Sequence, residues 1–349
     1  MTKLRVLVVE DSITVRKRLC EVLAQDPELE VVGEAGNGKL AIDLCRTLRP
    51  DVLTMDMMLP RMTGLAATEH IMAYFPTPIL IISSSFNRGE LLRTYDALAA
   101  GAVDVLEKPN GDQPEGDWER RLISSVKMVS RIRVVTHLRA RVNARHHALR
   151  ASGWPRCKLI AIGASTGGPS AMVDVLRALP SPVCVPVLMV LHINERFGTA
   201  FAEWLEQQTP HRVAYAQGGE SLAAACGRVL MAPPARHLMV SDGCLRLMQA
   251  PERHACRPSI DYLFESLASE CGAATAACLL TGMGRDGAAG LLQIRRAGGL
   301  TIAQDEATSL IYGMPREAVL IGAAQRVLPL GEIGPTLAAA TTPGPGGET

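Results

Sequence analysis

The stretch LIAIGASTGGP, residues 159–169, holds a serine in a setting that suits nucleophilic chemistry. An apolar run ends at Gly163, and Ser165 follows among small residues in the pattern G-x-S-x-G. This pattern lies between a predicted strand and a predicted helix, as a serine nucleophile on a tight turn requires. A phosphate-binding turn and a plain helix cap are the alternatives. The run lacks the G-x-G-x-x-G spacing, and no acidic residue ends the next strand.

A serine hydroxyl needs a base within hydrogen-bond reach, and four histidines differ in their expected positions. His192 ends the apolar run VPVLMVLHI, so we expect it at the same sheet edge as Ser165. His237 follows the run GRVLMAP and stays a rival. His211 begins a strand, at the opposite edge, and His254 lies in an irregular segment.

The glycine-rich stretch LLTGMGRDGAAG, residues 279–290, offers an acid to orient the base. Asp286 heads a predicted helix there, and it either orients His192 or simply caps that helix. The order Ser165, His192, Asp286 differs from the Ser-Asp-His order of α/β-hydrolases, which argues against that fold. A helix that begins at Gly168 would leave backbone N–H groups near the serine to receive negative charge.

The first part of the chain places polar residues at the ends of successive predicted strands. Glu10 and Asp11 end the first, Asp56 the third, Ser83 the fourth and Lys108 the fifth. In an open parallel sheet these ends form the ligand-binding edge. Three carboxylates repel one another, and Mg²⁺ would relieve that repulsion, while a hydroxyl and an ammonium would hold a phosphoryl group. The alternative makes Asp11 a helix cap and Lys108 a surface residue.

Continuous apolar strands alternate with helical stretches along most of the chain. This rhythm predicts an α/β protein with two doubly wound parallel-sheet domains, flavodoxin-like in residues 1–125 and Rossmann-like in residues 157–340. Between them, residues 126–156 form a predicted basic linker, with seven Lys/Arg, three His and no acid from 127 to 150. Asp-Gly in HLMVSDGCLRLM predicts a hairpin. The Pro/Gly-rich tail, residues 341–349, is predicted to be disordered.

Composition narrows the function classes. The 349 residues are 48% hydrophobic and carry a net charge of +1. So small a net charge creates no overall electrostatic attraction to nucleic acid or to a membrane. Nine cysteines show no CxxC pair or zinc spacing and indicate a reducing compartment. With no signal peptide and no membrane-length apolar run, we expect a cytoplasmic protein that is not membrane-inserted.

The motifs VEDS, MDMMLPRMTG, ISS and EKP resemble those of a response-regulator receiver domain. The resemblance implies that Asp56 accepts a phosphoryl group from a histidine kinase, and that Ser83 and Lys108 contact that group. The Mg²⁺ ligands that it implies are Glu10, Asp11 and Asp56. The chain departs from the family at Val105, where many receivers have an aromatic switch residue.

The motifs GASTGGP, LHI, LLTGMGRDG and AQDEATSLIYGMPREA resemble the catalytic domain of the chemotaxis protein-glutamate methylesterases, the CheB family. The resemblance implies Ser165 as nucleophile, His192 as general base and Asp286 as its partner. It also implies that the oxyanion is stabilised near Met283 and Thr166.

The implied substrates are methylated glutamates on the cytoplasmic helices of methyl-accepting chemoreceptors, with methanol as product. The same acyl chemistry would deamidate receptor glutamines. We expect the unphosphorylated receiver to inhibit the esterase. We also expect the chain to be a monomer, as the default oligomeric state. Two rival classes stay open: a response regulator with a DNA-binding output, and a catalytically inactive scaffold.

Overall fold

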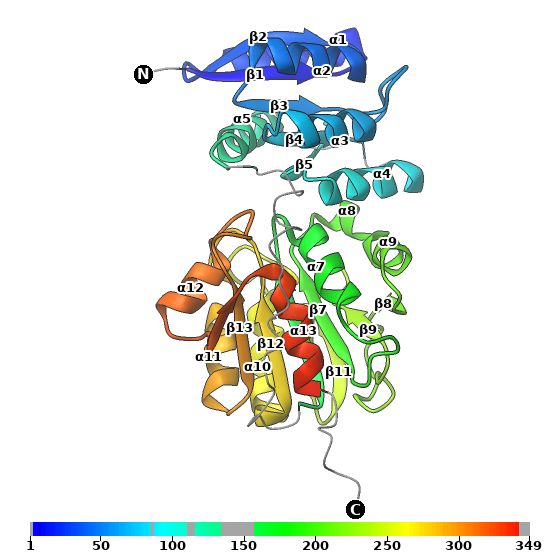
Figure 1. The fold of residues 1–349 in the computed structure, drawn as a ribbon, viewed down its shortest axis with the longest axis vertical. Coiled ribbons are helices and arrows are strands. Elements are labelled where there is room, and N and C mark those ends of the chain that lie inside the picture. Colours follow the sequence, from blue (N-terminus) through cyan, green and yellow to red (C-terminus); the bar gives the residue numbers. More distant parts are fainter. Residues whose placement is uncertain (1–2, 85–86, 110–115, 133, 135–156, 342–349) are drawn as a thin grey trace, which may run out of the picture. The chain divides into compact units, whose positions relative to one another are not determined.

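The structure is a computed structural model, and it describes residues 3–84, 87–109, 116–132, 134 and 157–341. The chain divides into two compact units, residues 1–143 and 144–349 (Figure 1). Each unit is built around its own parallel sheet, as the alternation of strands and helices predicts.

The first unit has five parallel strands in the order β2-β1-β3-β4-β5. The strands are β1 (Leu4–Val9), β2 (Leu29–Ala35), β3 (Val52–Met55), β4 (Ile79–Ser83) and β5 (Asp104–Glu107). The helices are α1 (Ile13–Ala24), α2 (Gly38–Leu48), α3 (Gly64–Tyr74), α4 (Arg88–Ala99) and α5 (Asp117–Ser130).

Short polar side chains fix where four of these helices begin. Ser12, Asn37, Thr63 and Asn87 each stand just before a helix, and each side-chain oxygen accepts a backbone N–H three residues later. Such caps satisfy N–H groups that the helix itself leaves without a partner. Helices α1, α2 and α4 begin three to five residues after the strands that precede them.

Both faces of the first sheet are buried, which explains why its strands are continuously apolar. On one face, residues of β1, β3 and β4 pack against α2, α3 and α4, with Leu7, Leu53 and Ile71 fully buried. On the alternate positions of the strands, Val6 and Val8 are equally buried. Helices α1 and α5 contact each other and supply further buried apolar residues.

The second unit has seven parallel strands in the order β14-β13-β12-β6-β7-β9-β8. These are β6 (Leu159–Ala164), β7 (Val187–Leu191), β8 (Val213–Tyr215), β9 (Val229–Met231), β12 (Thr275–Leu279), β13 (Leu300–Gln304) and β14 (Arg326–Leu328). The α-helices are α7 (Gly168–Arg177), α8 (Glu195–Gly198), α9 (Phe201–Gln208), α10 (Ile260–Glu270), α11 (Ala288–Arg296), α12 (Met314–Leu320) and α13 (Leu330–Thr341), and a 3₁₀ turn spans Gly272–Ala274.

A separate antiparallel pair, β10 (His237–Ser241) and β11 (Cys244–Met248), confirms the hairpin predicted around Asp242-Gly243. Both turn residues have positive φ, 51° and 68°, as the Asp-Gly turn requires.

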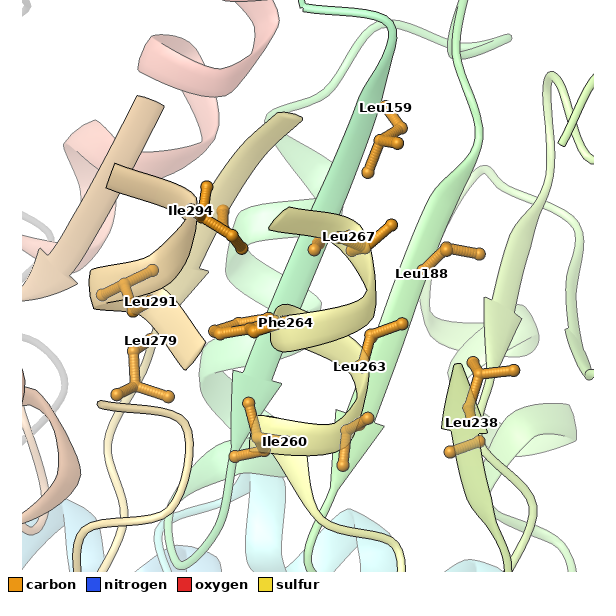
Figure 2. Packing of buried hydrophobic residues seen from close by; sticks show 14 of the residues in the cluster. Leu159, Leu188, Leu238, Ile260, Leu263, Phe264, Leu267, Leu279, Leu291 and Ile294 are labelled. Atoms are coloured by element: carbon orange, nitrogen blue, oxygen red, sulfur yellow. The ribbon is translucent and has the colours of Figure 1, made fainter. Parts of the chain in front are cut away.

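Helix α10 packs along the second sheet through one apolar stripe. Ile260, Leu263, Phe264 and Leu267 all point into the cluster that Figure 2 shows, and all are fully buried. Their spacing of three, one and three residues is that of a single helix face. This packing fixes the N-terminus of α10 against the carboxyl edge of the sheet.

The end of the first domain that the sequence predicts, residue 125, falls inside α5, which continues to Ser130. Lys127, counted above with the basic linker, belongs to this helix, and its ammonium lies 2.7 Å from Asp26 Oδ2 and 2.6 Å from Glu28 Oε2. Most of the predicted linker, residues 135–156, and residues 342–349 of the predicted tail lie outside the described residues.

We predict that Asp104→Asn stabilises the first unit at pH 8 and not at pH 4. Burial raises the pKa of Asp104 from 3.8 to about 6, although the Val105 N–H partly opposes this. The folded state therefore favours the protonated acid, and stability falls as pH rises from the unfolded pKa through about 6. Because the side chain is only partly buried, we expect a gain of about 1–2 kcal/mol.

Hydrogen exchange of the β4 and β5 amides in the full-length chain measures this gain for the first unit alone. Asp43→Asn, at a carboxylate on α2 that is 53% exposed, is the matched control and should change nothing. An equal gain for Asp104→Asn at both pH values would contradict the prediction.

Candidate active site and acidic pocket

Three carboxylates meet at the carboxyl edge of the first sheet, as the sequence predicts. Glu10 and Asp56 are almost fully buried, and Asp11 is exposed beside them. One oxygen from each of the three lies within 4.8 Å of the others. Burial and the neighbouring charge of Asp56 raise the pKa of Glu10 above its ordinary value. The pocket therefore concentrates negative charge in a place that water reaches poorly.

Lys108 enters this pocket from the end of β5. Its Nζ lies 2.9 Å from Glu10 Oε2 and 3.1 Å from Asp56 Oδ2. Burial alone would lower the pKa of Lys108, but the two carboxylates outweigh it and raise that pKa. The ammonium thus offsets part of the repulsion between the acids.

Ser83 ends β4 beside the pocket, but its hydroxyl is turned to a different partner. Ser83 Oγ donates to Glu90 Oε1 at 2.7 Å, and Thr94 Oγ1 donates to Ser83 Oγ at 3.3 Å. Glu90, on α4, also accepts the Ser84 hydroxyl at 2.8 Å. No sequence pattern predicts this role for Glu90, because the contact depends on how α4 packs against β4.

The turn after β6 holds Ser165 half-buried at the carboxyl edge of the second sheet. The Ser165 N–H donates to Thr281 O at 3.0 Å, and Gly168 N–H donates to Ser165 O at 2.7 Å. Gly167 has φ of 80°, and a Cβ there would lie 2.8 Å from Leu310 Cβ. Only glycine fits this turn, on both conformational and steric grounds.

His192 lies directly beside this turn, because β6 and β7 are hydrogen-bonded neighbours. Its backbone N–H donates to Ala164 O at 3.0 Å. The His192 imidazole joins Asp286 through Nε2 and Oδ2 at 2.8 Å. Asp286 is nearly fully buried, and the His192 side chain is 11% exposed.

The rival histidines have other partners. His237 Nε2 meets Pro251 O, its Nδ1 accepts the Ser259 N–H at 3.1 Å, and its ring stacks on Tyr262. His211 is buried with Nε2 2.8 Å from Leu176 O. His254 Nε2 lies 3.3 Å from Asp261 Oδ2.

Asp286 does not cap its own helix, since the N-cap of α11 is Gly287. Its carboxylate instead lies at the N-terminus of α10. Oδ1 accepts from Ser259 Oγ at 2.7 Å and from Asp261 N–H at 3.2 Å, and Oδ2 accepts from Ile260 N–H at 2.6 Å. Burial would raise the pKa of Asp286, but the hydrogen bonds from His192, Ser259 and Ile260 outweigh it and hold that pKa below its usual value.

The second imidazole nitrogen faces a thiol. His192 Nδ1 lies 3.6 Å from Cys256 Sγ. Burial alone would lower the pKa of His192, yet its contacts with Asp286 and Cys256 raise it to about 9. Within the described part of the chain, no hydrogen bond joins Ser165 Oγ to His192.

The loop after β12 lies against the serine. A Cβ on Gly282 would come within 2.6 Å of Ser165 Cβ, so the close approach depends on glycine. The next residue, Met283, is 58% exposed. Among the described residues, the N–H groups of Met283 and Thr166 donate to no protein acceptor. Buried Gln304 supports this loop, because its Oε1 accepts the Thr281 N–H at 2.8 Å.

Comparisons with known proteins match both units. A family model described as CheB methylesterase matches residues 160–337, about half of the chain, and one described as response regulator receiver domain matches residues 6–114. The chain is 43% identical over 330 residues to the protein-glutamate methylesterase/protein-glutamine glutaminase 2 of Anaeromyxobacter dehalogenans, covering 95% of both chains. The chain belongs to the CheB methylesterase family.

Another member, the protein-glutamate methylesterase/protein-glutamine glutaminase of Nitrosospira multiformis, is 41% identical over 342 residues and covers 96% of both chains. A crystal structure of the Thermotoga maritima CheB methylesterase catalytic domain shares 31% identity at a TM-score of 0.49, covering 52% of this chain and 97% of that chain. The acidic pocket of this CheB-type chain lies in the segment that matches the receiver family.

Sequence reasoning missed two residues of this candidate CheB site, Ser259 and Cys256. Ser259 stands before α10 and looks like an ordinary N-cap, but the structure records no cap hydrogen bond from it within its own helix. Its hydroxyl serves Asp286 instead. No sequence motif includes Cys256, and its position beside His192 depends on the loop that precedes α10.

We predict that Ser259→Ala lowers kcat for ester hydrolysis by about 10-fold or more and leaves KM nearly unchanged. A hydrogen bond to a charged group contributes roughly 1.5–3 kcal/mol, and this one fixes the carboxylate that orients His192. Steady-state methanol release measures both constants.

Ser266→Ala, on the same helix, is the matched control. Ser266 Oγ donates to Leu263 O and accepts the Val240 N–H, with no contact to Asp286. A loss of kcat that is equal in the two variants would make Ser259 a residue of general stability rather than of positioning.

Proposed function

We propose that this chain hydrolyses methylated glutamate side chains of methyl-accepting chemoreceptors, and deamidates receptor glutamines, through Ser165, His192 and Asp286. The observation that supports this most directly is the buried His192–Asp286 hydrogen bond beside the glycine-bounded turn of Ser165. The relatives named above have both activities in their names. All nine cysteines are free, which agrees with a cytoplasmic site of action.

The base acts through one particular nitrogen. Asp286 holds Nε2 at 2.8 Å, so Nδ1 is the nitrogen left to take the proton of Ser165. In the resting site Nδ1 faces Cys256, and catalytic hydrogen bonds often tighten only when substrate binds. In the enzyme–substrate complex that we propose, the Ser165 hydroxyl contacts Nδ1 and completes the serine–base pair.

The reaction then proceeds by acyl transfer. Ser165 Oγ attacks the γ-carbonyl carbon of the methylated glutamate, and its proton passes to His192 Nδ1. The tetrahedral intermediate collapses, and the same proton leaves with the methoxide as methanol. Water, deprotonated by His192, attacks the acyl-enzyme, and His192 returns the proton to Ser165 Oγ as the ester bond breaks and the glutamate is freed. With a glutamine substrate the leaving group is ammonia.

Backbone N–H groups stabilise the oxyanion in this scheme. Those of Met283 and Thr166 flank the serine and have no protein acceptor among the described residues. Donors that are fixed before the reaction stabilise developing charge without reorganisation, and each contributes roughly 10²–10³ in rate.

The acidic pocket supplies the regulation that we propose. Asp56 would accept a phosphoryl group from a histidine kinase, and Glu10, Asp11 and Asp56 would hold Mg²⁺. The residues present fit this ion, since the donors are all oxygens and the pKa of Glu10 is raised by burial and by Asp56. Lys108 then contacts the phosphoryl group, and Ser83 leaves Glu90 to do the same. Phosphorylation relieves inhibition of the esterase by the receiver unit.

We predict that Ser165→Ala reduces methanol release from methyl-labelled chemoreceptor membranes by at least about 10³-fold. The loss removes the nucleophile of the acyl-transfer step, and the residual rate comes from binding and the oxyanion donors. Ser170→Ala, in the first turns of α7, is the control and should keep the wild-type rate. Unchanged release by Ser165→Ala would remove the serine from the mechanism.

We predict that a small phosphodonor with Mg²⁺ raises methanol release by the wild-type chain, and that Asp56→Asn abolishes this stimulation. The stimulated rate divided by the unstimulated rate of the same variant is the quantity to measure. EDTA should return the wild-type ratio to one, because the pocket then lacks its cation. Asp43→Asn, at an exposed carboxylate of the same unit, should keep the wild-type ratio. A ratio above one in Asp56→Asn would place the phosphoryl acceptor elsewhere.

A further inference from the structure

Cys256 is the one residue at the candidate site for which the proposed mechanism has no use. Its thiol lies 3.6 Å from His192 Nδ1 and 3.4 Å from His254 O. A tight turn presents it there, in which Arg253 and Cys256 exchange two backbone hydrogen bonds of 3.1 and 2.9 Å. The two residues between them, His254 and Ala255, have φ of 54° and 58°. The thiol is thus held in place by a conformation that non-glycine residues seldom adopt.

We propose that His192 Nδ1 and Cys256 Sγ form a binding site for a thiophilic divalent cation of the Zn²⁺ type, and that the bound cation inhibits the esterase. Imidazole nitrogen and thiolate sulfur are the ligands that Zn²⁺ prefers. The inhibition rests on the proposed function, because the cation would occupy the nitrogen that must take the proton of Ser165. The binding does not rest on it.

The spacing of the two atoms fits one tetrahedral ion. Zinc bonds of roughly 2.3 Å to sulfur and roughly 2.05 Å to nitrogen, at a tetrahedral angle, place those atoms about 3.5 Å apart. The observed separation of Nδ1 and Sγ is 3.6 Å. The separation of the two atoms is therefore the one that a single tetrahedral ion bridges.

The surroundings of His192 are those of a metal ligand. A metal-binding imidazole commonly donates its other N–H to a carboxylate, which fixes the ring and raises its basicity. His192 Nε2 meets Asp286 Oδ2 in this way, at 2.8 Å. The oxygens of Asp286 already accept from Ser259, Ile260 and Asp261, so Asp286 orients the ligand and does not itself bind the ion.

The site is open on one side and binds reversibly. Cys256 is half-buried and the His192 side chain is 11% exposed, so water can supply the remaining ligands. A site with two protein ligands holds its ion less tightly than a closed four-ligand structural site. A neighbouring group of possible ligands, His254, Asp261 and Asp286, is less favourable, because the Arg285 guanidinium lies 3.3 Å from His254 Nδ1.

Titration with Co²⁺ tests the binding directly. A cobalt ion bound by a thiolate gives a sulfur-to-metal charge-transfer band in the near ultraviolet, whereas cobalt in the oxygen-only pocket of the first unit gives none. We expect this band from the full-length wild-type chain and its loss in Cys256→Ser. The double variant Cys184→Ser/Cys226→Ser removes the two exposed thiols and is the control that should keep the band. A band that survives in Cys256→Ser, or no band in the wild type, overturns the proposal.

Methanol release at buffered concentrations of free Zn²⁺ tests the inhibition. Each variant is compared with its own metal-free rate. We expect the concentration for half-inhibition to rise at least 10-fold in Cys256→Ser and to stay unchanged in the control double variant. Equal half-inhibition in Cys256→Ser and wild type overturns the inhibitory role. If the metal-free wild type releases no methanol, the proposed function fails, and the cobalt band still decides whether the site exists.

Discussion

The carboxylate of Asp286, buried at the N-terminus of α10, is the constraint on which the second unit depends. A buried carboxylate is costly unless its oxygens are satisfied, and here the His192 ring, the Ser259 hydroxyl and two backbone N–H groups surround it. The helix N-terminus adds a favourable dipole. These contacts tie three segments together: the end of β7, the start of α10 and the loop after β12. The apolar stripe of α10 shown in Figure 2 therefore positions the base as well as building the core.

The two units stabilise their buried carboxylates in different ways. Each gathers ionisable groups at the carboxyl edge of a parallel sheet, where strand ends converge and helices begin. In the first unit a side-chain charge, the ammonium of Lys108, offsets two buried carboxylates. In the second unit fixed N–H groups of the backbone do so for Asp286. A side-chain cation can move to a newly added phosphoryl group, whereas backbone donors stay in place. The first arrangement suits a pocket that changes state, and the second suits a preorganised active site.

The fold and the positions of Ser165, His192 and Asp286 were predictable because strand ends in a parallel sheet share one edge. The contact of Asp286 with His192 is one of the two roles that the sequence offers, but its place at the N-terminus of α10 was not predictable, because that depends on packing across the chain. The contact of Ser83 with Glu90 likewise depends on the packing of a helix on a strand. Cys256 lies beside His192 only because of how a loop with two left-handed residues folds back. Periodicity and motifs predict which residues are neighbours along the chain, whereas these contacts join residues that are distant in the sequence.

Both nitrogens of the His192 ring are engaged in the resting site, which has a direct chemical consequence. Nε2 is committed to Asp286, so in the proposed mechanism Ser165 and Cys256 share Nδ1. The serine needs a neutral nitrogen that accepts its proton, whereas the contacts with Asp286 and Cys256 together raise the pKa of the ring to about 9. A ring that remains protonated cannot activate the serine. In the proposed mechanism, substrate binding at the Ser165 turn must therefore free Nδ1 from Cys256 and shift the ring to its neutral form.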